Sequence, residues 1–191
     1  MRAPRIAIVG ARRVRQGLGP FVTRHLVSLG AEVPAFLGTS ASTIDVAARE
    51  LEDTVGLRPS GYTSLRDLLA REEVDALAIL SPAETHGHYL EAALQAGLHV
   101  LSEKPLLWGG EGLAARAHQL SEGFAARGLL LAENCQWPYT LDAFAELHPG
   151  ALSGPTEAFA MRLSPASRGA QMIGDAPVSY THLTLPTILR V

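Results

Sequence analysis

Short apolar runs alternate with stretches of helical periodicity along most of this chain, and this alternation limits the fold more than any other feature. Run 75–80 is apolar at every position after Asp75, as expected for a strand buried on both faces of a parallel sheet. Strands separated by helices favour right-handed βαβ units, so the sequence predicts an α/β fold with a doubly wound parallel sheet. The expected strands are 5–9, 32–37, 75–80, 98–102 and 129–133. The expected helices are 21–29, one capped by Ser42 or Thr43, a short one capped by Ser64, 84–96, 111–127 and 141–148.

The sequence pattern changes after Glu133, and we place a domain boundary after residue 135. Residues 1–135 are expected to form the sheet domain, and residues 136–178 to begin a second domain with a strand at 156–163. Residues 179–191 continue neither pattern and look like read-through past a broken gene end. We therefore expect that tail, including His182, not to belong to the native fold.

Composition argues against several classes of function. A net charge of −3 gives no reason to expect a nucleic-acid partner. The single cysteine, Cys135, excludes an intrachain disulfide and fits a reducing compartment. The apolar run 6–9 is too short for a signal-peptide core or a membrane span, so we expect a cytoplasmic protein without a membrane partner. The histidines lack Cys, Asp or Glu neighbours at ligand spacing, so no metal site is expected.

Polar segments follow four of the predicted strands, at 10–19, 38–42, 81–86 and 103–105. The carboxyl ends of parallel strands share one edge of the sheet, and ligands of such sheets bind at that edge. We therefore expect the four segments to meet at a single site.

The first of these segments is a glycine-rich turn. A dinucleotide fingerprint, G-x-G-x-x-G, lets the pyrophosphate approach the N-terminus of the following helix. Arg12 stands here in place of the second glycine, and the loop is longer than the fingerprint. Loop arginines can bind phosphate through charge-assisted hydrogen bonds, and an ordinary glycine-rich turn is the alternative. The candidate cofactor-binding residues of this turn are Gly10, Ala11, Arg12, Arg13, Gly17 and Gly19.

The segment after the second strand carries hydroxyl groups and no acidic residue. Thr39 and Ser40 stand where a carboxylate would bind the ribose 2′-hydroxyl of NAD(H). A carboxylate would repel the 2′-phosphate of NADP(H), whereas hydroxyls with arginines nearby tolerate it. Thr39 and Ser40 are therefore candidate cofactor-binding residues, and the expected cofactor is NAD(P) with a weak preference for NADP. The alternative is that this loop merely turns.

Lys104 is the only lysine in a chain that otherwise uses arginine as its cation. Arginine stays charged and presents a fixed fork, whereas a lysine ammonium is compact and can be tuned to exchange a proton. Lys104 is therefore the candidate catalytic residue, able to polarise a substrate oxygen or to join a proton relay. A lysine-poor composition that left one lysine by chance is the alternative.

Ser81-Pro82-x-x-Thr85-His86, followed by Glu103-Lys104-Pro105, gives the sequence its most specific pattern. This order resembles the glucose–fructose oxidoreductase / inositol dehydrogenase family of NAD(P)-dependent enzymes, over about residues 4–165. The resemblance implies a Rossmann domain followed by an α/β domain with an open sheet. It also implies that the 81–86 loop lines the nicotinamide side of the cofactor, and that Lys104 reaches the oxygen of the reacting carbon.

Further roles follow from the same resemblance. The peptide before Pro105 is expected to be cis, a conformation that is cheap only before proline. From the residues themselves, Glu103 is expected to hydrogen-bond backbone or cofactor and to fix the turn, and His86 to cap the helix or contact the cofactor. The candidate cofactor-binding residues of these two segments are Ser81, Pro82, His86, Glu103 and Lys104.

Relatives of this family carry a second domain that supplies an aspartate and a histidine, and the histidine usually acts as the main acid/base. That pair does not appear in the expected context here, so we expect an incomplete chain. Relatives usually associate through the sheet of that domain, so no oligomer is inferred.

The function expected from the sequence is hydride transfer between a nicotinamide cofactor and a sugar, polyol or related hydroxy or keto compound. The alternatives are a non-catalytic dinucleotide-binding module or sensor, and a Rossmann scaffold that serves only as an interaction domain.

Overall fold

The computed structural model of the chain describes residues 2–12, 17–135, 137–150 and 153. Its contacts divide the chain into two compact units, Met1–Cys135 and Gln136–Val191. In the second unit the described structure consists mainly of helix α6, Trp137–Leu147. The expected strand at 156–163 and the tail from residue 179 lie outside the described residues, as does Arg13.

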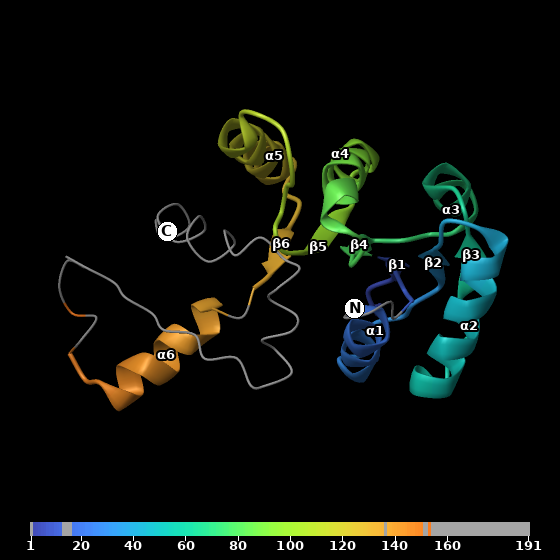
Figure 1. The fold of residues 1–191 in the computed structure, drawn as a ribbon, viewed down its shortest axis with the longest axis horizontal. Coiled ribbons are helices and arrows are strands. Elements are labelled where there is room, and N and C mark those ends of the chain that lie inside the picture. Colours follow the sequence, from blue (N-terminus) through green and yellow to red (C-terminus); the bar gives the residue numbers. More distant parts are fainter. Residues whose placement is uncertain (1, 13–16, 136, 151–152, 154–191) are drawn as a thin grey trace. The chain divides into compact units, whose positions relative to one another are not determined.

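A parallel sheet forms the centre of the first unit, and Figure 1 shows its strands side by side. The strands are β1 Ile6–Val9, β2 Ala35–Leu37, β3 Ser60–Tyr62, β4 Ala76–Ile79, β5 His99–Glu103 and β6 Leu131–Asn134. They pair in the order β3-β2-β1-β4-β5-β6, and every pairing is parallel. This order is that of the Rossmann fold, which confirms the predicted α/β fold.

Helices cover both faces of the sheet. They are α1 Gly19–Ser28, α2 Ala41–Val55, α3 Leu65–Arg71, α4 His86–Ala96 and α5 Leu113–Ala126, with a 3₁₀ turn η1 at Ala83–Thr85. Figure 1 shows α1 and α2 on one face and α3, α4 and α5 on the other. None of the helices in the described part of the chain is long and apolar enough to cross a membrane.

Two apolar cores lie between the sheet and these helix layers. Successive side chains of a strand point to opposite faces, and β1 divides its residues accordingly. Ala7 and Val9 belong to the core that contains Phe124 of α5. Ile8 belongs to the other core, which contains Leu51 of α2. All five side chains are at most 2% exposed, so β1 anchors both layers.

The helix ends explain where the loops begin. Ser40, and not Ser42 or Thr43 as predicted, caps α2, because its hydroxyl accepts from Thr43 N while Thr43 Oγ1 accepts from Ser40 N in a reciprocal capping box. Gly97 ends α4 in the left-handed conformation at φ 74°, which costs glycine little. Only two residues, Gly97 and Leu98, separate α4 from β5, and the carboxyl end of β5 carries the Glu103–Lys104–Pro105 segment.

Candidate functional site

The carboxyl ends of the strands bring the predicted segments to one edge of the sheet. β1 and β4 are neighbours although the chain passes through β2 and β3 between them, so the strand order reverses at this pair. Ligands of open α/β sheets bind in the crevice outside such a switch point. The turn that begins at Gly10 follows β1, and the loop that begins with Leu80 and Ser81 follows β4. The candidate site is centred on these two loops.

Gly10 is required where it stands. Its φ is +89°, and a Cβ placed on it would lie 2.7 Å from the carbonyl carbon of Leu80 and from Ser81 N. Its N–H lies 3.5 Å from Leu37 O, at the end of β2. The glycine turn therefore touches the loops on both sides of it, and any side chain at position 10 would meet backbone.

Gly19 allows helix α1 to approach the same turn closely. A Cβ on Gly19 would lie 2.3 Å from Ala11 O and 2.6 Å from Gly10 O. The third glycine of a dinucleotide fingerprint likewise allows close packing of the helix against the strand. Gly17 is half-buried just before the helix, and Arg12 has no hydrogen bond or ion pair with any residue that the structure describes. The guanidinium of Arg12 is thus available to an anionic ligand.

Thr39 and Ser40 lie between the end of β2 and helix α2. Thr43 Oγ1 accepts hydrogen bonds from Thr39 N at 3.1 Å and from Ser40 N at 2.9 Å. The Thr39 side chain is exposed, and its hydroxyl lies 3.4 Å from Thr43 Oγ1. The described structure thus has a small hydroxyl cluster at the N-terminus of α2, where anions are favoured.

The Ser81 loop is held by its own hydroxyls. Ser81 Oγ lies 2.7 Å from Thr85 Oγ1, and the Thr85 hydroxyl donates to Pro82 O at 2.7 Å. Pro82 precedes the 3₁₀ turn η1 and is exposed. These contacts join the start of the loop to the 3₁₀ turn.

His86 joins two of the predicted segments. Its side chain is 1% exposed. Its Nδ1 lies 2.8 Å from Pro105 O, and its Nε2 lies 2.9 Å from Ser81 O. Both ring nitrogens thus face backbone carbonyls, and binding of the cofactor by His86 stays a prediction. The ring connects the loop after β4 with the turn after β5.

Lys104 is exposed at the end of β5, next to a peptide bond to Pro105 that is cis, as predicted. Its ammonium makes no hydrogen bond or ion pair with any described residue. Glu103, which precedes it, accepts a hydrogen bond from Asn134 Nδ2 of the neighbouring strand β6. Asn134 thus braces the turn through Glu103, while Lys104 is left free to meet a ligand.

Glu133 is a residue that the sequence reasoning missed. Its Oε1 accepts a hydrogen bond from Leu106 N at 2.9 Å, one residue beyond Pro105. Burial raises the pKa of the Glu133 carboxyl, with a smaller rise from Glu103, against lowering by the Leu106 hydrogen bond, His86 and Lys104. An acidic residue ending an apolar strand beside the Glu-Lys-Pro strand was the signal that could have found it.

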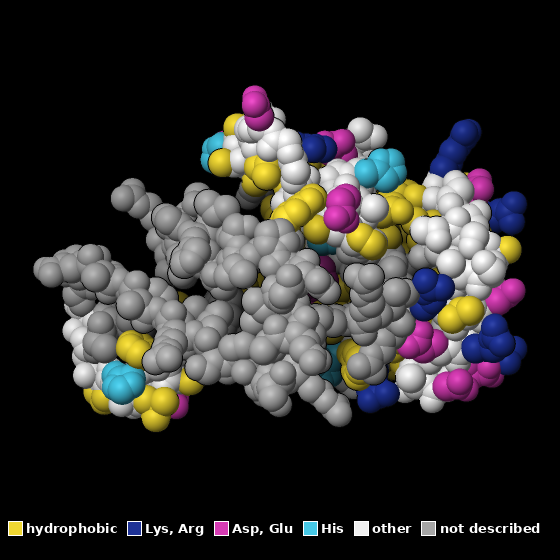
Figure 2. Space-filling view, viewed as in Figure 1, with side chains coloured by type: hydrophobic (Ala, Val, Ile, Leu, Met, Phe, Trp, Pro, Cys, Tyr) yellow, Lys and Arg dark blue, Asp and Glu magenta, His cyan; other side chains and the backbone are white. Residues whose placement is uncertain are grey.

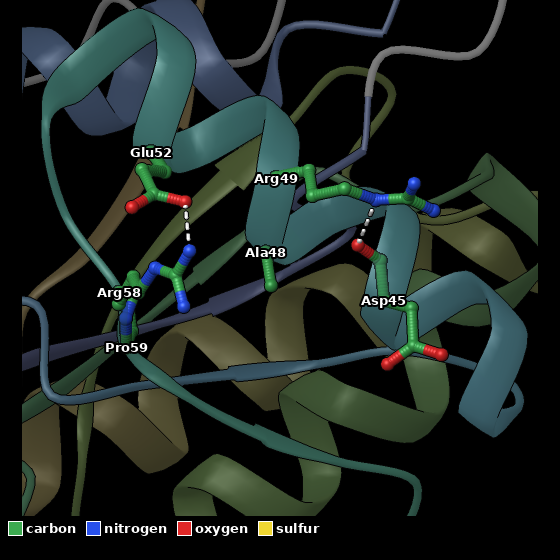
Figure 3. Close-up of a pocket in the computed structure, with 6 residues that line it drawn as sticks. All are labelled: Asp45, Ala48, Arg49, Glu52, Arg58 and Pro59. Carbon is green, nitrogen blue, oxygen red and sulfur yellow. Dashed lines mark hydrogen bonds and ion pairs between the residues drawn. The ribbon is translucent and has the colours of Figure 1, made fainter.

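A hollow on the outer face of α2 is a second candidate site, but its two arginines and Glu52 already have partners within it. Figure 3 shows Arg58 bound to Glu52, at 2.5 Å, and Arg49 bound to the carbonyl of Asp45. Figure 2 shows both signs of charge mixed on the side of the molecule where Figure 1 places α2. Arg58 and Pro59 precede β3, so that end of the hollow lies at the edge of the sheet opposite the carboxyl ends. The hollow is not part of the candidate site.

Comparison with known proteins gives consistent results. Residues 4–133 match the model of the oxidoreductase family with an NAD-binding Rossmann fold. The chain is 35% identical over 135 residues to dTDP-3,4-didehydro-2,6-dideoxy-alpha-D-glucose 3-reductase of Streptomyces violaceoruber, covering 70% of this chain and 36% of that enzyme. It is 38% identical over 77 residues to inositol 2-dehydrogenase of Corynebacterium glutamicum, covering 40% of this chain and 21% of the relative.

A solved structure shares the fold. KijD10, a 3-ketoreductase from Actinomadura kijaniata in complex with TDP-benzene and NADP, superimposes with a TM-score of 0.57 at 28% sequence identity. The match covers 78% of this chain and 45% of KijD10. The chain thus spans less than half the length of the relatives that it matches.

Proposed function

The chain belongs to the oxidoreductase family with an NAD-binding Rossmann fold, and from that premise we propose that it binds NAD(P) for hydride transfer to or from a sugar, polyol or related compound. The observation that carries this proposal is the meeting of the segments after β1, β4 and β5. Gly10 abuts Ser81, and His86 links Ser81 to Pro105 beside an unpaired Lys104.

Each of these parts has a role in the proposed reaction. The turn at Gly10 and Arg12 would hold the pyrophosphate, and the Ser81 loop would lie along the nicotinamide. Oxidation of a secondary alcohol needs a group that accepts the hydroxyl proton or stabilises the developing alkoxide. The exposed ammonium of Lys104 would bind that oxygen, while the bound cofactor supplies the hydride chemistry. The named activities of the sugar-nucleotide reductase and of inositol dehydrogenase support a polyhydroxylated substrate.

We further propose that NADP(H) is preferred over NAD(H). The hydroxyl cluster after β2 holds no carboxylate that would repel a 2′-phosphate, and Arg12 is free of described partners. Binding of NADP by KijD10 agrees with this preference.

Thr39→Asp tests the preference. A carboxylate roughly 4 Å from the 2′-phosphate costs about 1–4 kcal/mol, so the affinity for NADPH should fall about tenfold or more relative to NADH. Fluorescence titration of both cofactors measures this change, and Thr39→Asn is the uncharged control of the same size. Equal losses for NADPH and NADH in Thr39→Asp would mean that the 2′-phosphate binds elsewhere.

The proposed function itself is tested in two steps. Saturable enhancement of NADPH fluorescence by this chain is the first expected result, and absence of binding at millimolar cofactor would leave only a scaffold. The second expected result is consumption of NADPH in the presence of a keto sugar, measured with a form of the protein that turns over. Binding without turnover over a range of sugar, polyol and sugar-nucleotide substrates would favour the non-catalytic module or sensor.

A further inference from the structure

The peptide group between Pro105 and Leu106 is held at both of its polar ends. Its carbonyl oxygen lies 2.8 Å from His86 Nδ1, and its N–H donates to Glu133 Oε1 at 2.9 Å. His86 begins α4 and Glu133 lies in β6, so the two side chains come from different elements. One residue before this peptide group stands Lys104.

We propose that His86 and Glu133 are positioning residues, which clamp the Pro105–Leu106 peptide group and thereby fix where the Lys104 ammonium meets the cofactor and substrate. This inference rests on the proposed function, in which Lys104 binds the reacting oxygen. Because the ammonium has no partner among the described residues, its own contacts do not place it. The backbone at the base of the side chain must do so, and a displacement of about 1 Å in a reacting group is costly to catalysis.

The clamp also ties the lysine turn to the loop on the nicotinamide side. The second ring nitrogen of His86 lies 2.9 Å from Ser81 O. The backbone of Ser81 in turn lies against Gly10. A shift of the cofactor loop would therefore be transmitted through one buried ring to the residue after Lys104.

Charge adds to this arrangement. The partly buried carboxyl of Glu133 also interacts electrostatically with Glu103, which raises its pKa, and with His86 and Lys104, which lower it. Glu133 and Asn134 are neighbours on β6, and they hold Leu106 and Glu103 on either side of the lysine. The turn is thus held by side chains both before and after Lys104.

Hydrogen exchange at the Leu106 amide tests the clamp directly. Glu133→Ala removes the acceptor, and we expect the amide of Leu106 to exchange about tenfold faster or more. Glu133→Gln keeps an acceptor oxygen, and its Leu106 amide should exchange nearly as in the original protein. The amide of Leu77, buried in β4, serves as the internal control. Unchanged exchange at Leu106 in Glu133→Ala, or an equal acceleration at Leu77, would overturn the proposal.

Acylation of Lys104 by an amine-reactive ester tests the consequence for the lysine. Lys104 carries the only side-chain amine of the chain, so mass spectrometry reads a single side-chain site. We expect saturating NADPH to slow its acylation in the original protein and in Glu133→Gln, and to protect it much less in Glu133→Ala. Equal protection in all three proteins would overturn the positioning role.

The two measurements separate the clamp from the proposed function. If the original chain does not bind NADPH, the proposed function fails, while exchange at Leu106 still decides whether the peptide is clamped. If NADPH binds but the Glu133 variants behave alike in both measurements, the clamp fails and the proposed function stands. Substitutions are placed at Glu133 because the buried ring of His86 lies against both Pro105 O and Ser81 O, so replacing it would disturb two loops at once.

Discussion

Lys104 stands at the proposed reacting end of the site, and its chemistry differs from that of the arginines found elsewhere in the sequence. Lys104→Arg keeps a positive charge but replaces a compact ammonium with a planar group that does not give up a proton. We expect turnover by the active protein to fall about 10²–10⁴-fold, the usual contribution of a positioned acid or base. The dissociation constant for NADPH should change little.

Steady-state rates and cofactor titration on the same protein measure the two effects separately. Arg12→Gln is the matched control, because removing a guanidinium from the proposed phosphate site should weaken cofactor binding and leave turnover at saturating cofactor nearly intact. Unchanged turnover in Lys104→Arg would remove Lys104 from the mechanism.

At single residues, sequence reasoning found positions more readily than contacts. Lys104 and His86 were identified because their residue types are informative in their sequence context. The sequence could not show that both nitrogens of His86 face carbonyls, since Ser81 O and Pro105 O come from separate loops. Glu133 was read only as the end of a strand, because its partner at Leu106 becomes a neighbour only through the β5–β6 pairing.

Among the elements, the contact between α1 and the turn after β1 is the tightest that bears on the site. Gly19→Ala would place a methyl group 2.3 Å from Ala11 O, against backbone that cannot yield easily. We expect the free energy of unfolding to fall by about 1–3 kcal/mol, as for other overpacked positions, and NADPH affinity to fall with it. Urea denaturation monitored by circular dichroism measures the first effect.

Gly123→Ala in α5 is the matched control. A methyl group there meets Leu94 Cδ2 at 2.8 Å, which is the far end of a flexible side chain. Replacing a glycine inside a helix gains up to about 1 kcal/mol in helix propensity, so this variant should be nearly neutral or more stable. If both variants unfold at the same urea concentration, the close approach of α1 is not important to stability.

The elements themselves were largely predictable where periodicity was strong. β4 and α4 lie within a residue or two of their expected bounds, because Gly97 and the apolar run leave little choice. β3 was not located, since Ser60-Gly61-Tyr62 lacks an apolar pattern. Its place is set by pairing with β2 and by the Tyr62 hydroxyl, which donates to Glu72 at 2.8 Å.

For the molecule as a whole, Glu133 gives stability a specific dependence on pH. Burial raises the pKa of its carboxyl in the folded state above the unfolded value. The folded protein therefore binds the proton of the Glu133 carboxyl more tightly than the unfolded chain does. The contribution of Glu133 to the free energy of unfolding consequently falls as pH rises from the unfolded pKa through the folded pKa. Glu133→Gln removes this loss, so its stability relative to the original protein should increase across that pH range.

Urea denaturation at a series of pH values from below the ordinary glutamate pKa to neutrality measures the difference. Asp53→Asn, at an exposed position of α2, controls for the replacement of a carboxylate by an amide. A stability difference between Glu133→Gln and the original protein that stays constant with pH would show that the raised pKa does not affect folding.

The overall topology followed from the alternation of strands and helices, which is why the parallel sheet was foreseen. The alternation did not predict which strands are neighbours in the sheet. Periodicity gives each strand its faces but not its partners, and the β1–β4 pairing that creates the crevice entered only with the resemblance to a known family. The sequence could therefore assign the site to the edge of the sheet at the carboxyl ends of the strands. It could not predict the contacts within the site.

That same pairing affects the protein while it is still being made. Ile6 in β1 lies beside Ala76 in β4, so one side of the central strand has no neighbour until the chain up to β4 has been translated. At roughly 5–20 residues per second, a ribosome takes several seconds to supply the missing strand. During that interval we expect the β4 side of β1 to remain without its partner strand.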